Sequence, residues 1–228
     1  MFSKDKSNCS YILFPSFFNK QELPKAIFNN IENINFNKFN CPSVGYVKDK
    51  VYTVNSYINL EVEYGLKNNE PYYNYVLDEK TNVITEDLHN LIKSLLQISY
   101  NNNILNLQLL TPYAFITDDK DLEVVTTTPN MKNENSIYVS GGLKPYSCIR
   151  SLNSAWTLKD YKKPGKLYFN LEDPFMSFVF NKNIKLNYME PNDKILNYIQ
   201  QSLHITAIRR NLKQTYKNAI SRRPKKLL

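Results

Sequence analysis

Residues 58–64 read INLEVEY, and apolar and polar side chains alternate through the whole stretch. Successive side chains of a β-strand point to opposite faces of the sheet, so this alternation predicts a half-buried strand. The stretch before it, VYTVNSY at residues 51–57, is rich in β-branched and aromatic residues. Such residues favour strands, and we expect this stretch to extend the strand at 58–64 or to pair with it.

One helix is predicted within the series of strands, at residues 85–99, which read TEDLHNLIKSLLQIS. Its leucines and isoleucine recur every three or four residues, which is the spacing of an amphipathic helix. Thr85 stands where it can cap the first turn, and Glu86 and Asp87 follow where the helix dipole favours negative charge.

Short apolar runs follow this helix and are separated by turn-like pieces rich in Asp, Asn, Gly and Pro. In chain order they are ILNLQLL, YAFIT, LEVVTTT, SIYVS, SAWTLK, KLYFNL, FMSFVF and IKLNYM. Short strands with frequent turns favour antiparallel pairing over βαβ units. We therefore predict a mainly β domain at residues 1–191, of antiparallel β-sandwich or jelly-roll type. Its segment 1–43 lacks a clean period and is expected to be irregular, apart from helical spacing at 20–34.

Helical spacing returns after Pro191, and Pro224 is expected to end the helix. A helix over residues 193–221 would be about 43 Å long at 1.5 Å per residue, which exceeds the width of a small domain. Its second half is therefore expected to project from the body. Residues 192–228 form the second predicted unit, a long basic amphipathic helix and tail.

Positive charge is concentrated in that second unit. The formal net charge of the 228-residue chain is +8, and residues 204–228 contain no Asp or Glu. The eight basic residues there are Arg209, Arg210, Lys213, Lys217, Arg222, Arg223, Lys225 and Lys226. The rest of the chain carries equal numbers of basic and acidic residues.

Such a run is typical of an element that follows a phosphate backbone. Tyr216 is the one aromatic residue among these charges, so base stacking is not indicated and nucleic-acid binding would be sequence-neutral. An acidic protein surface would suit the same charges. Membrane binding is not predicted, because the apolar face lacks Trp and Phe. A further alternative stays open, in which the apolar stripe packs on the chain's own domain and the charges face water.

Catalytic motifs are not evident in the sequence. His89 and His204 lie far apart and match no metal-ligand spacing, and no nucleophile elbow or nucleotide-binding glycine fingerprint occurs. No metal or other cofactor is expected. The acids at residues 118–123 indicate a polar hairpin turn, since the glycine and final glutamate of a calcium loop are missing.

Arg150 and Trp156 leave two interpretations open. Trp156 is expected to pack in the core, while a minority interpretation has both residues line a pocket at the mouth of the sandwich. That pocket belongs to the alternative hypothesis, a small-molecule enzyme of cupin or oxygenase-like β architecture with its site inside the sandwich. An iron site of that class needs two histidines on facing strands, whereas both histidines here fall in predicted helices.

The cysteines and apolar runs bear on the compartment. Cys9, Cys41 and Cys148 are odd in number and widely spaced, which favours a reducing intracellular setting over a disulfide framework. No run approaches the ~20 apolar residues of a spanning helix, so we expect a soluble protein.

The last prediction comes from a resemblance over residues 41–189. The stretches CPSVGYVKDKVYTVNSYINLEVEY, LQLLTPYAFITDDKDLEVVTTTP, GGLKPYSCIRSLNSAWTLKD and EDPFMSFVFNKNIKL resemble an uncharacterised β-rich family carried by marine tailed phages and some bacteria. The resemblance implies a β-rich fold and a viral or viral-like origin, which would place the protein in the cytoplasm of the host cell or in a virion. It supplies no functional residues, because the family has no known activity. The leading hypothesis is a non-enzymatic phage accessory or structural protein that binds an acidic partner through its basic C-terminal helix.

Overall fold

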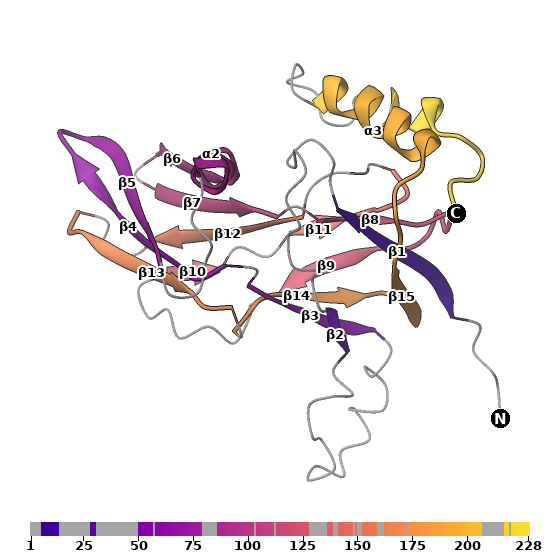
Figure 1. Cartoon of the computed structure of the whole chain (residues 1–228), viewed down its shortest axis with the longest axis horizontal. Coiled ribbons are helices and arrows are strands. Elements are labelled where there is room, and N and C mark those ends of the chain that lie inside the picture. Colours follow the sequence, from indigo (N-terminus) through magenta and orange to yellow (C-terminus); the bar gives the residue numbers. More distant parts are fainter. Residues whose placement is uncertain are drawn as a thin grey trace, which may run out of the picture.

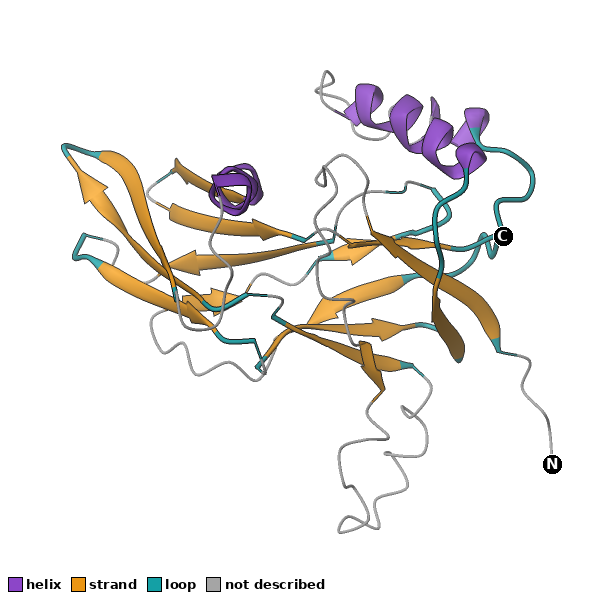
Figure 2. Ribbon diagram, viewed as in Figure 1, coloured by secondary structure: helices purple, strands orange, loops and turns teal. Residues whose placement is uncertain are grey.

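A computed structural model of the chain shows a mainly β molecule with helices on one side (Figures 1 and 2). It describes residues 6–13, 28–30, 50–56, 58–78, 86–102, 104–111, 113–127, 136–138, 141–147, 149, 152–158, 162–171, 173–206, 217–218 and 220–228. The predicted β-rich class is confirmed.

The described strands form four sheets, in which each strand is hydrogen-bonded to its neighbours in the order given. The first sheet joins β15 (Ile184–Tyr188), β1 (Ser7–Leu13) and β8 (Tyr113–Ile116). The second joins β10 (Ser136–Tyr138), β12 (Asn153–Leu158), β7 (Ile104–Leu110) and β6 (Leu96–Asn101). The third joins β11 (Gly142–Leu143), β9 (Val124–Thr127), β14 (Pro174–Phe180), β3 (Val51–Asn55) and β2 (Phe28–Asn30). The fourth joins β13 (Gly165–Phe169), β4 (Leu60–Lys67) and β5 (Glu70–Leu77).

Strand β4 confirms the alternation from which the prediction began. Leu60, Val62 and Tyr64 are buried, while Glu61 and Glu63 on the opposite face are half-buried. The expectation that residues 51–57 extend or pair with this strand is wrong, because β3 belongs to a different sheet.

The chain turns a corner between these two strands. The Ser56 hydroxyl donates to the carbonyl of Ile58 at 2.6 Å, and the Ser56 N–H donates to the carbonyl of Asp173 at 3.0 Å. These bonds satisfy the backbone at the corner and direct β4 into the fourth sheet.

The structure of the N-terminal segment differs from the prediction. Residues 1–43 are not irregular throughout, because β1 and β2 lie within them, and residues 28–30 are a strand and not part of a helix. Strand β1 lies between β15 and β8, parallel to β15 and antiparallel to β8. All other recorded strand pairs among the described residues are antiparallel.

The predicted inserted helix is present as α2 (Glu86–Leu95), but it is shorter than the predicted range 85–99, because residues 96–99 belong to strand β6, into which the helix passes directly. His89 lies on α2 with its Nδ1 3.1 Å from the hydroxyl of Tyr75 on β5. The helix thus contributes Ile92 and Leu95 to the interior and a polar contact to the neighbouring sheet.

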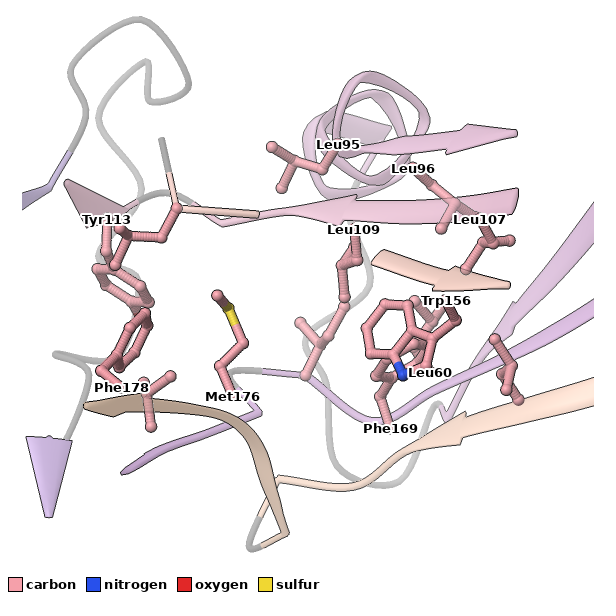
Figure 3. Packing of buried hydrophobic residues seen from close by; sticks show 14 of the residues in the cluster. Leu60, Leu95, Leu96, Leu107, Leu109, Tyr113, Trp156, Phe169, Met176 and Phe178 are labelled. Atoms are coloured by element: carbon pink, nitrogen blue, oxygen red, sulfur yellow. The ribbon is translucent and has the colours of Figure 1, made fainter. Parts of the chain in front are cut away.

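One hydrophobic core receives side chains from all four sheets. Figure 3 shows Leu107 and Leu109 of β7 on one side of it and Met176 and Phe178 of β14 on the other. Burial of this apolar surface is the main force that holds the sheets together.

Two glycines each lie opposite a tyrosine on the neighbouring strand. Gly165 pairs with Tyr64, and Gly65 pairs with Tyr72. A Cβ at Gly165 would lie 2.5 Å from Cζ of Tyr64, and a Cβ at Gly65 would lie 2.9 Å from Cε1 of Tyr72. Both rings therefore rest on a surface that only glycine provides.

We expect Gly165→Ala to lower the free energy of unfolding by about 1–3 kcal/mol, because the Tyr64 ring is fully buried and cannot move aside. Gly65→Ala is the matched control, since half-buried Tyr72 can rotate toward solvent, and its cost should be the smaller of the two. Urea unfolding of both variants measures the difference. Equal costs would show that the Tyr64 ring yields as easily as the Tyr72 ring.

A second, smaller core lies on the outer face of the first sheet. Ile12 of β1 and Ala114 and Ile116 of β8 face it, and α3 (Asp193–Thr206) covers it with side chains from its first two turns. Its buried members are Ile12, Ala114, Ile116, Ile149, Ile195, Tyr198, Ile199 and Leu227. All of β8 is buried because its two faces contact different cores.

The predicted long helix over residues 193–221 is wrong. Lys194 Nζ donates to the carbonyl of Lys226, so the end of the chain lies beside the start of α3. In one straight helix residues 194 and 221 would be about 40 Å apart, and the five residues to 226 span at most about 18 Å. Residues 217–218 and 220–222 are helical, and Figure 1 shows this second piece beside α3. The C-terminal residues therefore return to the domain and do not project from it.

Candidate functional site

The candidate site is the tail segment, by which we mean residues 217–218 and 220–228. Four of the eight predicted cations lie on it with exposed side chains, namely Lys217, Arg222, Lys225 and Lys226. Arg209, Arg210 and Lys213 lie outside the described residues. The remaining cation, Arg223, has a different environment.

Arg223 was predicted to be part of the binding surface, but the structure places it in the interior. Its side chain is 1% exposed, and its Nη2 donates to the carbonyl of Thr117 and, at 3.2 Å, to Oδ1 of Asp118. The guanidinium carbon lies 4.3 Å from the ring centroid of Tyr146 and 5.6 Å from that of Tyr198. These contacts hold Arg223 inside the protein, where it cannot reach a partner in this structure.

Aromatic faces stabilise a cation by their quadrupole, and this contact is strongest when both groups are desolvated. The two rings therefore offset part of the cost of burying Arg223. Its Nε and Nη1 are buried and have no hydrogen-bond acceptor among the described residues. The positive charge of buried Arg223 is therefore compensated mainly by the carboxylate of Asp118.

Asp118 also binds the backbone of the tail segment. The N–H of Leu227 donates to both carboxylate oxygens, at 2.9 and 3.1 Å, and the N–H of Leu228 donates to Oδ2 at 2.9 Å. The Leu227 side chain is buried in the second core beside Ile195 and Tyr198. The tail segment is therefore held at two points, Arg223 and Leu227, by one carboxylate and one apolar core.

The neighbouring acid, Asp119, holds the turn that carries Asp118. Ser7 donates to Asp119 at 2.7 Å and Lys182 at 2.9 Å. Burial raises the pKa of Asp119, but hydrogen bonds from Lys182, Ser7 and the N–H of Asp121 outweigh it, so the pKa lies below its usual value. The stabilisation from this carboxylate is therefore present above its unfolded pKa and is lost as the pH falls through the lowered one.

The predicted acidic turn at residues 118–123 is present, but it does not close a hairpin, because β8 and β9 lie in different sheets. Among the described residues, no three His, Cys, Asp or Glu side chains gather as a metal site would require. The carboxylates of Asp118 and Asp119 are used to fix the tail segment and β1.

The proposed pocket of Arg150 and Trp156 is not formed by Trp156. This tryptophan is 2% exposed, and its ring centroid lies 5.2 Å from that of Phe169 at an interplanar angle of 70°. Trp156 is therefore a core residue, as its principal interpretation predicts (Figure 3). Arg150 lies outside the described residues.

Two surface depressions lie elsewhere on the described part of the chain. One of about 380 Å³ lies at the β9–β11 edge and includes Glu123 and Lys144, which form an ion pair. Another of about 510 Å³ lies on the exposed face of the fourth sheet, where Val76 and Tyr168 are exposed. Neither contains a residue that the sequence singled out for catalysis.

Sequence reasoning missed Asp118 as the residue that binds the tail segment. One signal was available, since the final KKLL places two leucines after four cations and a proline, and leucines favour burial. The carboxylate that receives their backbone lies 109 residues earlier, and nothing local in the sequence points to it.

None of the helices in the described part of the chain combines the length and apolar character needed to cross a bilayer. Comparisons of the chain with models of protein families, with curated proteins and with solved structures find no match. The likeness to a phage family over residues 41–189 therefore remains a prediction from the sequence.

Proposed function

We propose that the protein is a non-enzymatic, phage-encoded accessory or structural protein that binds an acidic partner, a nucleic acid or an acidic protein surface, through its basic C-terminal residues. The β-rich body, which we propose to be a sandwich of jelly-roll type, serves as the platform. The protein would act in the host cytoplasm or as part of a virion.

The observation that carries the proposal is that some side chains of the tail segment are buried and attach it to the domain, while four of its cations are exposed. Arg223 and Leu227 point inward, while Lys217, Arg222, Lys225 and Lys226 are exposed. Residues 1–203 carry equal numbers of basic and acidic residues, and residues 204–228 contain no Asp or Glu, so no acidic run beside these cations offsets their charge. Exposed cations held on a folded support attract polyanions without reading their sequence.

Point substitutions test this proposal better than truncation at Pro191. Removal of residues 192–228 would uncover Ile12, Ala114 and Ile116, because α3 and Leu227 cover them. A loss of binding would then be confused with a loss of folding.

The test replaces the four exposed tail cations together by glutamine in the full chain. The binding of random-sequence DNA, RNA and poly-glutamate is followed by fluorescence anisotropy at two or more salt concentrations. Four phosphate contacts give a slope of about −4 in log K against log salt for duplex DNA. We expect the variant to bind at least about tenfold more weakly and to lose most of that slope.

A matched control removes four exposed cations from the body, with Lys67, Lys93, Lys162 and Lys163 changed to glutamine. The net charge falls by the same amount, so the control separates position from total charge. Equal losses in the two variants would contradict a local site. Wild-type protein that binds none of the probes would contradict the proposed function itself.

A further inference from the structure

We propose that Asp118, although it is negatively charged, strengthens the binding of a phosphate backbone by holding the tail cations in one arrangement. Asp118 would then be a positioning residue for a polyanion. This inference rests on the proposed function, and it names the nucleic-acid backbone as the partner of the same surface.

Along the tail segment, the buried residues that attach it to the domain alternate with the exposed cations. Arg222 directly precedes buried Arg223, and Lys225 and Lys226 lie between Arg223 and buried Leu227. Asp118 contacts both attachment points, through the guanidinium of Arg223 and the N–H of Leu227. The positions of at least three exposed cations therefore depend on one carboxylate.

The exposed side of the tail segment suits phosphates better than a protein surface. Protein interfaces usually bury an aromatic or apolar centre, and charged residues are depleted there. The described tail residues include no aromatic side chain, and Leu227 is turned inward. Ile220, 41% exposed, is the one large apolar side chain that the described tail residues present to solvent. A run of cations with this little apolar surface matches a repeating phosphate chain.

Asp118 affects the binding of a polyanion in two opposite ways, and their relative sizes decide whether it strengthens or weakens binding. Its negative charge repels a polyanion, but Arg223 at 3.2 Å offsets that charge, and only 25% of the Asp118 side chain is exposed. Its ordering effect has no such offset, because a loose tail must lose conformational freedom when it binds. We therefore expect ordering to exceed repulsion.

The test compares Asp118→Ala with Asp121→Ala in the full chain. Asp121 is exposed in the same turn, and the two changes remove the same charge. A purely electrostatic role predicts that both variants bind a random-sequence DNA duplex as tightly as wild type or more tightly. The positioning role predicts that Asp118→Ala binds about tenfold more weakly, while Asp121→Ala does not.

A second variant removes the apolar attachment without any change of charge. Leu227→Ser should weaken duplex binding in the same direction as Asp118→Ala, with a smaller salt slope in both variants. Hydrogen exchange should show faster exchange at residues 223–228 in both variants and not in Asp121→Ala. Circular dichroism at the assay temperature confirms that the domain is folded.

The outcomes distinguish the inference from the function on which it rests. Wild-type affinity for the duplex in Asp118→Ala, or equal affinities in Asp118→Ala and Asp121→Ala, overturns the positioning role and leaves the proposed function standing. Tight wild-type binding to poly-glutamate without binding to the duplex overturns the choice of a phosphate partner. A wild-type protein that binds neither probe overturns both proposals.

Discussion

Replacement of Trp156 by alanine is expected to lower the free energy of unfolding by about 3–5 kcal/mol, the usual cost of deleting a buried aromatic side chain. Trp156 lies on β12 in the centre of the main core, 2% exposed, and packs edge-to-face on Phe169. Its removal leaves a cavity between the second and fourth sheets, to which these two residues belong. Urea unfolding followed by circular dichroism measures the change.

A control for this prediction comes from the strand that carries Phe169. Tyr168 is the preceding residue on β13, and it is 48% exposed on the opposite face. Tyr168→Ala removes a comparable aromatic group without a cavity, so it should cost less than about 1 kcal/mol. A small cost for Trp156→Ala would mean that the two sheets do not pack through this residue.

The second large effect is expected at Asp118. Asp118→Ala should lower the free energy of unfolding by about 3–5 kcal/mol, because it leaves the buried charge of Arg223 without its carboxylate. The two tyrosine rings and the carbonyl of Thr117 remain, but Nε and Nη1 have no acceptor among the described residues. The same protein should show faster hydrogen exchange in the tail segment.

Removal of both charges tests this explanation. The double variant Asp118→Ala with Arg223→Met has no buried charge, and its unfolding free energy should recover at least about half of the loss. Asp121→Ala, in the same turn but exposed, should change stability by no more than about 0.5 kcal/mol. A double variant that is no more stable than Asp118→Ala would show that the lost hydrogen bonds to Leu227 and Leu228, and not the unpaired charge, are the cause.

Local patterns predicted those parts of the fold in which one face of an element contacts one core. Burial alternates along β4 from Leu60 to Tyr64 because one face of the strand contacts the main core while the other is only half-buried. Helix α2 likewise places Ile92 and Leu95 in the main core. The sheet that each strand joins was not predictable in this way, because a corner such as that at Ser56 depends on a bond to distant Asp173.

Strand β1 was not predicted from the sequence, for a related reason. It pairs on both edges, and its Cys9 and Ile12 contact different cores, so burial along it does not follow a period of two. Its polar residues Asn8 and Ser10 also dilute the apolar signal.

The candidate site was predicted in its composition but not in its arrangement. A charge count identifies the basic residues, yet it cannot tell Arg222, which is exposed, from Arg223, which is buried. The difference arises from Asp118 and Tyr146, which only the folded chain brings to Arg223.

The position of β1 also sets the order in which a growing chain can fold on the ribosome. Ser7 pairs with Ile184, and Ser10 pairs with Ile116, so β1 needs partners that are synthesised much later than β1 itself. At the usual rate of translation the wait for β15 is on the order of 10–40 s. During that time the β4–β5 and β6–β7 hairpins can form from neighbouring sequence, while Cys9 and Ile12 stay uncovered. Nascent chains of this protein should therefore depend on chaperones that bind the apolar residues of β1 until β8 and β15 have emerged.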